Sequence, residues 1–165
     1  MSQIGARILL EAADTRILPY NLTDYKEALN NNLAALEAHL QGNVTLDHLV
    51  REVRNFSRNA DAFEQRKAEA SDTQNFAKLR MLNDQMMNME RAFNLAVWIA
   101  GKEIVRHVLF APQMHNIYGS SSFPGITDAL FDIEKTNNWK LVKEQVSIAI
   151  TCVREAGKIL VAIDK

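Results

Sequence analysis

The sequence predicts an all-α protein, a four-helix bundle of up-down type with a long irregular loop and a short helix between its last two long helices. Four segments carry apolar residues at spacings of three and four, which place them on one face of a helix. The three prolines and four of the six glycines, Gly42, Gly101, Gly119 and Gly125, gather at apparent joints between segments. No segment has a comparable strand pattern. Four amphipathic helices bury their apolar stripes most economically against one another.

The first forty residues contain the first two predicted helices. Residues 2–17 are rich in Ala and Leu, and this helix stops before Leu18-Pro19 because a residue that precedes proline is driven out of the α region. Thr23 is the predicted N-cap of the second helix, with Asp24 in its first turn. Gly42 is the predicted residue after its C-cap. The apolar stripe of this helix comprises Tyr25, Leu29, Leu33, Leu36 and Leu40.

The other three long helices follow the same rhythm. The third helix opens at Thr45 and its stripe comprises Leu46, Leu49, Val53, Phe56, Ala60 and Phe63. The stripe of the fourth comprises Leu79, Leu82, Met86, Met89 and Phe93. The final helix carries Trp139, Val142, Val146, Ala149, Val153, Ala156, Leu160 and Ile163. We interpret the methionines of the fourth helix as core filling rather than as an adaptable binding surface.

The stretch from Arg106 to Gly125 differs from the rest of the chain because it mixes Pro, Gly, Ser, His and aromatic residues. Long irregular connections in compact domains tend to carry function. The sequence Phe123-Pro124-Gly125 then precedes an apolar pattern, which favours a short helix with proline near its start. That pattern comprises Ile126, Ala129, Leu130 and Ile133.

Composition excludes several classes of protein. The chain has 165 residues, of which 47% are hydrophobic and 24% charged, so one compact domain over residues 1–165 is expected and whole-chain disorder is not. A net charge of −1, with no basic run longer than two residues, argues against a nucleic-acid partner. The longest apolar stretches are too short for a membrane span. No secretory signal is visible, so the chain is expected to be either cytosolic or a fragment.

The residues alone predict no catalytic or metal site. A di-iron bundle needs Glu-x-x-His motifs, and the nearest pattern here is Glu103-x-x-x-His107. The other histidines, His39, His48 and His115, are scattered without zinc-site spacing. The single cysteine, Cys152, lies beside the apolar stripe of the last helix and is expected to be an inert thiol. The polar run around Asn83, Asp84 and Gln85 is expected to be a solvated or helix-paired face.

Several long motifs in the second half of the chain resemble a known domain. These motifs occur in the same order as in that domain, and a further motif, ILPY (17–20), lies near the start of the chain. The motifs of the second half are LRMLNDQMMNMERAF (79–93), RHVLFAP (106–112), HNIY (115–118), SFPGI (122–126) and DALFDIE (128–134). The chain resembles the C-terminal, transferrin-receptor-like dimerisation domain of the glutamate carboxypeptidase II family, whose members are also called N-acetylated-alpha-linked acidic dipeptidase or prostate-specific membrane antigen.

The resemblance implies that the chain is a fragment of a larger extracellular zinc metallopeptidase, a hydrolase whose protease domain holds two zinc ions and whose apical domain shapes the substrate cleft. This chain would hold no cofactor and have no hydrolytic activity of its own. Its implied partners are its own copy, in a homodimer, and the protease and apical domains of the parent protein. The alternative is the partner-binding domain of a non-catalytic, receptor-like relative of the transferrin-receptor type. An apolar second stripe on the bundle helices would supply a self-complementary interface.

The resemblance also implies a role for Asn116, Ile117 and Tyr118 as a loop that lines the pocket for the C-terminal residue of the substrate. The glutamate-preferring enzyme has lysine followed by tyrosine there, whereas this chain has Ile117 and Tyr118. Loss of the cation argues against strict glutamate specificity and favours neutral or apolar residues. The alternative is ordinary loop packing for both side chains.

Two further features concern the surface. The sequons at Asn21, Asn43 and Asn55 fit an extracellular glycoprotein, with Asn55 the best candidate because it lies off the apolar stripe and matches a sequon position in the family. In place of the family's proline-bearing loop at 94–105, this chain has an apolar segment. The fourth helix is therefore expected to extend toward Ala100, with Trp98 and Ile99 adding exposed apolar area.

Overall fold

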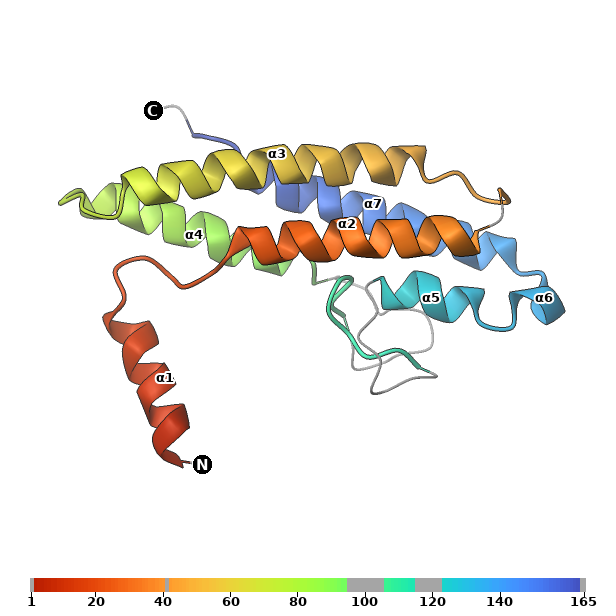
Figure 1. Cartoon of the computed structure of the whole chain (residues 1–165), viewed down its shortest axis with the longest axis horizontal. Coiled ribbons are helices and arrows are strands. Elements are labelled where there is room, and N and C mark those ends of the chain that lie inside the picture. The colour runs from red at the N-terminus through yellow and green to blue at the C-terminus, as the bar shows by residue number, and fades with distance from the viewer. Residues whose placement is uncertain (1, 41, 95–105, 115–122, 164–165) are drawn as a thin grey trace.

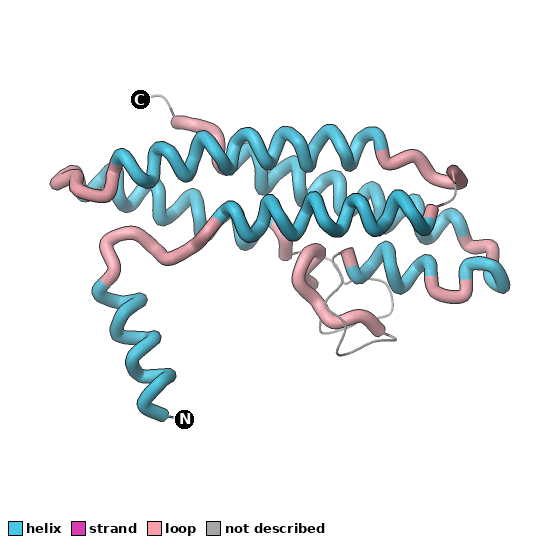
Figure 2. Tube along the Cα trace, viewed as in Figure 1, coloured by secondary structure: helices cyan, strands magenta, loops and turns pink. Residues whose placement is uncertain are grey.

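The computed structural model describes residues 2–40, 42–94, 106–114 and 123–163, and this part of the chain is helical throughout except for its connections (Figures 1 and 2). The described helices are α1 (Ser2–Asp14), α2 (Leu22–His39), α3 (Asp47–Glu69), α4 (Phe76–Ala92), α5 (Pro124–Leu130), α6 (Ile133–Thr136) and α7 (Trp139–Ile159). The predicted all-α class is confirmed.

The central pair of the fold is α3 and α7, which lie side by side (Figure 1). Helix α2 packs against α3, whereas α4 and the short α5 pack against α7. Helix α1 extends away from this assembly (Figure 1). The connection between α4 and α5 therefore starts and ends at helices that pack on the same neighbour, α7.

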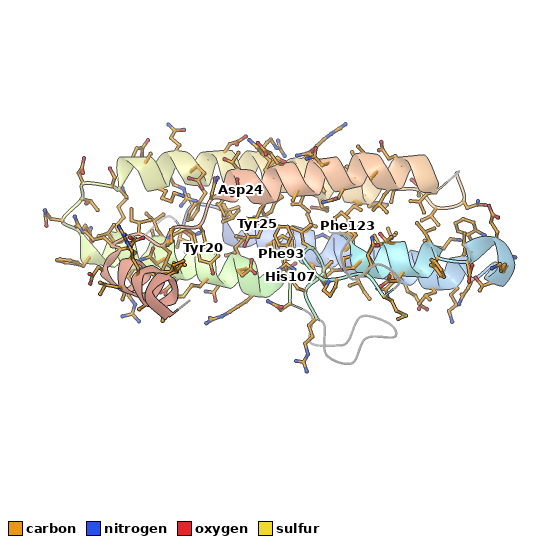
Figure 3. The ribbon with its side chains drawn as sticks, turned by 60° about the horizontal axis from the view of Figure 1, so that its bottom comes forward. Tyr20, Asp24, Tyr25, Phe93, His107 and Phe123 are labelled. Atoms are coloured by element: carbon orange, nitrogen blue, oxygen red, sulfur yellow. The ribbon has the colours of Figure 1, made fainter. Side chains whose placement is uncertain are left out.

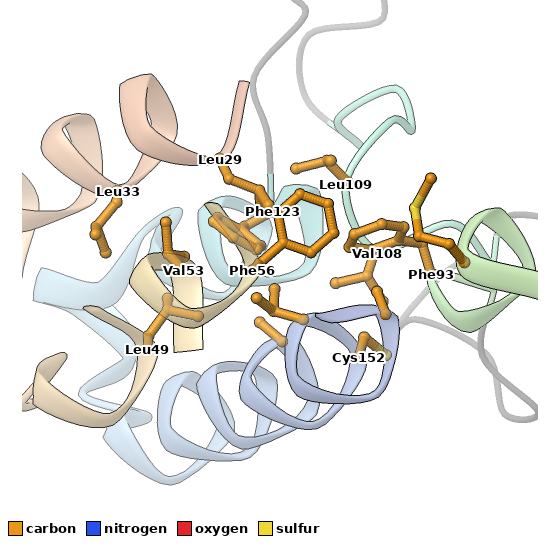
Figure 4. Close-up of a cluster of buried hydrophobic side chains, with 14 of the residues drawn as sticks. Leu29, Leu33, Leu49, Val53, Phe56, Phe93, Val108, Leu109, Phe123 and Cys152 are labelled. Atoms are coloured by element: carbon orange, nitrogen blue, oxygen red, sulfur yellow. The ribbon is translucent and has the colours of Figure 1, made fainter. Parts of the chain in front are cut away.

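The predicted stripes form one hydrophobic core (Figure 4). The exception is Ile163, which was expected in the stripe of the last helix but is exposed, because α7 ends at Ile159. Phe56, Phe93 and Phe123 are essentially inaccessible to solvent, and they come from α3, the end of α4 and the start of α5. Burying one large apolar side chain contributes about 1.5–3 kcal/mol, so this core is the main source of stability. Met86 and Met89 are also fully buried, as expected for core filling.

The helices α3 and α7 approach one another closely at Gly157. A Cβ atom at this position would lie 3.3 Å from the Cα atom of Phe56, which is a backbone atom and cannot move by a simple side-chain rotation. The carbonyl oxygen of Gly157 accepts a hydrogen bond of 2.8 Å from Nδ2 of Asn59 on α3. Absence of a side chain at Gly157 therefore sets the distance between the two central helices.

Several predicted helix ends are wrong by a few residues. Helix α1 ends at Asp14 rather than Ile17. The N-cap of α2 is Asn21 rather than Thr23, because the Asn21 side chain accepts a hydrogen bond from the backbone N–H of Thr23 at 3.1 Å. Helix α3 opens at Asp47, two residues after Thr45. Gly42 has a φ of 78° after α2, in the left-handed region where glycine is favoured.

The expected extension of α4 toward Ala100 is wrong. The helix ends at Ala92, and Asn94 instead forms an antiparallel bridge with His107. The backbone N–H of Val108 donates to the carbonyl oxygen of Phe93 at 2.8 Å, so the returning chain pairs with the end of α4. Trp98, Ile99 and Ala100 lie outside the described residues.

The predicted short helix is present but divided. It begins at Pro124, as the proline indicated, and ends at Leu130 because Phe131 is extended and Asp132 has a φ of 56°. Ile133, the last residue of the predicted apolar pattern, starts the separate turn of α6.

We predict that Gly157→Leu lowers the free energy of unfolding by about 2 kcal/mol, because overpacking against the α3 backbone outweighs the gain in helix propensity. Urea unfolding followed by circular dichroism measures this change. Gly5→Leu is the matched control, since a Cβ atom there meets nothing within 4 Å. Equal effects of the two substitutions would show that the contact between α3 and α7 does not limit stability.

Candidate functional site

The predicted pocket residues Asn116, Ile117 and Tyr118 lie outside the described residues, but the structure describes the chain on both sides of them. On one side are residues 106–114, which follow the bridge to the end of α4. On the other side is Phe123, which precedes α5. The candidate site is therefore the set of contacts that holds these two flanks against the bundle.

The first flank is held by a hydrogen-bonded cluster centred on His107. Its Nε2 atom lies 3.1 Å from Oε1 of Glu90 on α4. The hydroxyl of Tyr25 on α2 donates to Oε2 of the same carboxylate. On the other edge of the ring, Nδ1 accepts hydrogen bonds from the backbone N–H groups of Leu109 at 3.1 Å and Phe110 at 2.8 Å. One imidazole therefore connects the flank to α4 and, through Glu90, to α2.

Aromatic rings surround this cluster, and Figure 3 shows Tyr25, Phe93 and His107 gathered at the middle of the molecule. The imidazole stacks on Phe93 and on Phe110, with ring centroids 5.7 and 5.5 Å apart. Tyr25 stacks on Phe93 at 6.0 Å and meets Phe110 edge to face at 5.4 Å. Because Phe93 is buried and Phe110 is exposed, the cluster lies where the core meets the surface.

The protonation states of His107 and Tyr25 follow from the burial of the cluster. Desolvation lowers the pKa of His107 below its ordinary value, and this effect exceeds the opposing influence of Glu90. Burial, together with the hydrogen bond and charge of Glu90, raises the pKa of Tyr25. The imidazole is therefore neutral at pH 7 and the phenol keeps its proton, so both groups can act as hydrogen-bond donors to Glu90.

Two further anchors lie at the two ends of the loop, one at Met114 and one at Phe123. The backbone N–H of Met114 donates to Oδ1 of Asp128 on α5 at 2.9 Å. Phe123 is buried and adopts the left-handed conformation with a φ of 55°. It is followed by Pro124 in the first turn of α5. Met114 and Phe123, the described residues on either side of the loop, are thus both held in place and both connected to α5.

Two polar residues of α4 make contacts that the sequence analysis missed. Asn83 accepts a hydrogen bond from the backbone N–H of Leu18 at 2.9 Å and donates to the carbonyl oxygen of Arg16 at 3.0 Å. Gln85 is buried, and its Nε2 atom donates to the carbonyl oxygens of Ile159 at 2.6 Å and Val161 at 2.9 Å. The interpretation of this run as a solvated or helix-paired face is therefore wrong for Gln85.

The remaining chemical candidates are placed as follows. Cys152 is buried, and burial raises the pKa of its thiol to about 11, as expected for an inert core cysteine. His48 is exposed. Glu103 and His115 lie outside the described residues. Among the residues that the structure describes, no group of three or more His, Cys, Asp or Glu side chains could hold a metal ion.

The three sequons lie in different settings. Asn21 is exposed, but its Nδ2 atom donates to Oδ1 of Asp24 at 2.7 Å. Asn43 is exposed in the turn between α2 and α3. Asn55 is half-buried within α3, and its Nδ2 atom donates to Oε2 of Glu52 at 3.2 Å.

The expected apolar second stripe is not found on the described part of the bundle. Within the described residues of the long helices α2, α3, α4 and α7, only α4 presents a large, well-exposed apolar side chain, Phe76 in its first turn. Exposed apolar side chains instead gather on α1, where Ile4, Ile8, Leu9 and Leu10 all face solvent. None of the described helices combines the length and the apolar character that a membrane span requires.

Comparison with known proteins relates the chain to a group of peptidases. A probable glutamate carboxypeptidase of Arabidopsis thaliana, LAMP1, is 28% identical over 164 residues and aligns with 97% of this chain. The aminopeptidase NAALADL1 of Mus musculus is 30% identical over 173 residues and aligns with 99% of the chain. These alignments cover 24% and 23% of the two relatives, so the chain spans about a quarter of their length.

The sequence profile of the transferrin receptor-like dimerisation domain matches residues 44–161. This range begins in the turn before α3 and includes the α3–α7 pair, the flank that carries His107, and α5. The chain belongs to the transferrin receptor-like dimerisation domain family.

Proposed function

We propose that the chain is the C-terminal dimerisation domain of a longer peptidase, in which it mediates homodimerisation and contributes the loop at 116–118 to the pocket for the C-terminal residue of the substrate. The match of residues 44–161 to the family carries the proposal of dimerisation. The names of the relatives, which are peptidases, and the small share of their length that the chain spans support a longer parent protein.

The catalytic centre of this parent is proposed to lie outside the chain. Hydrolysis by a zinc peptidase needs several His, Asp or Glu ligands that converge on the metal. The described residues offer no such cluster and so do not fit a zinc site. Protease and apical domains with two zinc ions would therefore be supplied by the rest of the parent, which we propose to act outside the cell.

The proposed homodimer does not depend on the apolar face of α1. The family match begins at residue 44 and leaves out both α1 and α2. Stable interfaces between subunits bury about 1,200–2,000 Å² and have polar rims, so the helices from α3 to α7 can supply such a surface without a second apolar stripe. The exposed side chains of α1 are a separate source of association that an experiment has to remove.

We predict that the chain sediments as a dimer and that the dimer persists when Leu9 and Leu10 are both changed to Glu. These substitutions place charges on the exposed face of α1. Sedimentation equilibrium over a wide concentration range measures the mass. A dimer that is lost in the double variant would assign association to α1. A wild-type chain that is monomeric throughout would mean that residues 44–161 are insufficient for dimerisation.

The loop at 116–118 is proposed to favour neutral or apolar side chains. In the glutamate-preferring enzyme that the chain resembles, a lysine pairs with the carboxylate of a glutamate substrate, and Ile117 removes that cation. The described residues on either side of the loop are held in place, since Met114 is bonded to Asp128 and Phe123 is buried.

We predict that Ile117→Lys in the full-length parent raises activity toward a C-terminal glutamate, relative to a C-terminal leucine, by about tenfold or more, the value of one charge-assisted hydrogen bond. The ratio of kcat/KM for two peptides that differ only in this residue is the measurement. Ile163→Lys adds the same charge at an exposed position near the end of the chain and is the control. An unchanged ratio in Ile117→Lys would remove the loop from specificity.

Glycosylation of the sequons is proposed as part of the extracellular setting. Asn43 is exposed in a turn, which suits a bulky modification. Asn55 retains its place as a candidate by resemblance. A glycan on Nδ2 would disturb the bond of Asn21 to Asp24 beside the N-cap of α2, and in the same way the bond of Asn55 to Glu52 within α3.

We predict a glycan at Asn43 when the parent is secreted from a eukaryotic host, because Asn43 is the sequon whose side chain is exposed in a turn, whereas Nδ2 is hydrogen-bonded in Asn21 and Asn55. Peptide mass spectrometry before and after enzymatic deglycosylation measures occupancy at each site. Asn43→Gln should remove one glycan without unfolding the protein, because this side chain is exposed. Three unmodified sequons would refute the proposal.

A further inference from the structure

We infer that His107 is a positioning residue for the pocket loop: as the tautomer with its proton on Nε2, it fixes residues 106–114 on α4 and α2 and thereby sets where the segment toward Ile117 begins. The inference rests on the proposed function of the loop. It adds a residue outside the loop, since Asn116, the first residue of the loop, follows His107 by nine positions in the sequence.

The tautomer follows from the groups around the ring. Nδ1 faces two backbone N–H donors, those of Leu109 and Phe110, so it has to present a lone pair rather than a proton. Nε2 faces Oε1 of Glu90, so Nε2 carries the proton and donates a hydrogen bond to this carboxylate oxygen. The two bonds to the backbone tie the ring to its own loop, and the bond to Glu90 ties the ring to α4.

The surroundings disfavour the charged form of the imidazole. A proton on Nδ1 would point at the two backbone N–H groups and break both hydrogen bonds. The ring also stacks on Phe93 and Phe110, which offer no hydration to an imidazolium. The carboxylate in contact with the ring is that of Glu90, whose other oxygen accepts from the hydroxyl of Tyr25. Desolvation exceeds the influence of Glu90 on the pKa of His107, which agrees with a neutral ring.

The position of His107 is transmitted to Met114 over a short path that is mostly buried as far as Ala111 and exposed at Pro112 and Met114. Val108, Leu109 and Ala111 are buried, and the backbone N–H of Val108 is bonded to Phe93. At the end of this path Met114 is bonded to Asp128. The flank is therefore fixed near both of its ends, at His107 and at Met114, so release of His107 shifts the point from which the chain continues toward Ile117.

Three substitutions of His107 test separately its bonds to the loop backbone, its bond to Glu90 and its stacking on the aromatic rings. His107→Asn keeps an acceptor near the place of Nδ1, and His107→Gln keeps an N–H donor near the place of Nε2. His107→Phe keeps only the stacking between the two aromatic rings. In the full-length parent we expect His107→Phe to raise KM for a peptide substrate about tenfold with little change in kcat, and the Asn and Gln variants to lie between it and the wild type.

The control for general destabilisation is Leu160→Ala, which removes a buried side chain at the end of α7. It should lower the melting temperature without raising KM. Equal rises of KM in His107→Phe and Leu160→Ala would overturn the inference. A wild-type KM in His107→Phe, together with a changed specificity in Ile117→Lys, would overturn it and leave the proposed function standing. If neither variant has an effect, the proposed role of the loop in the pocket is removed and the inference with it.

A second measurement tests the tautomer in the chain itself. Long-range nitrogen–proton NMR at pH 7 should show His107 with an unprotonated Nδ1 and a protonated Nε2. A protonated Nδ1 at this pH would overturn the inference.

The neutral ring should also make stability depend on pH. The folded chain holds the pKa of His107 below its unfolded value, so the unfolded chain takes up a proton first as the pH falls. The stability that the neutral ring contributes is fully present above the unfolded pKa of about 6.5 and is lost progressively as the pH falls from there through the lower folded pKa. His107→Phe should lack this part of the pH dependence in urea unfolding, and an unchanged pH dependence would contradict a neutral ring.

Discussion

The contact between α3 and α7 at Gly157 and Phe56 is the constraint on which the other elements depend. Helix α2 packs on α3, and both α4 and α5 pack on α7, so each takes its position from this pair. Phe56 also meets Phe93 edge to face at 6.0 Å, and Phe93 stacks on His107. The close approach of α3 and α7 at Gly157 therefore fixes the position of Phe56. Phe56 in turn positions Phe93, and Phe93 positions His107.

Helix α4 joins the parts of the chain through its polar residues rather than through its apolar stripe. Asn83 binds the segment before α2, Gln85 binds the end of α7, and Glu90 binds both Tyr25 and His107. A polar group that is buried without a partner costs about 1–3 kcal/mol, so the bonds of the buried Gln85 penalise alternative arrangements most strongly, and those of the half-buried Asn83 and Glu90 less. The apolar stripes bring the helices together without direction, whereas these three side chains select one relative arrangement of linker, helix end and loop.

The sequence predicted the core better than it predicted the site, for physical reasons. The stripe of Val53, Phe56 and Phe63 repeats with the helix period, and burial follows directly from that repeat. Helix ends depend on single bonds, such as that from Thr23 to Asn21, which spacing does not reveal. Gln85 left a signal, because it lies at the stripe spacing three residues after Leu82 and four before Met89. His107 left none, since its carboxylate partner, Glu90, lies 17 positions earlier in the sequence, a separation that no helix spacing brings together.

Helix α1 differs from residues 44–161, the range that matches the family, in the number of apolar side chains that it exposes. The linker after α1 is held firmly, because Asn83 binds both Arg16 and Leu18, and Lys67 donates to the carbonyl oxygen of Tyr20 at 2.7 Å. Helix α1 therefore leaves the bundle from a fixed point although its own face is exposed. An isolated helix of 13 residues is only marginally stable in water, whereas the helices of the bundle are stabilised by a common core. Substitutions in α1 should consequently change the solubility and association of the chain while leaving the packing of α3 on α7, and the cluster around His107, intact.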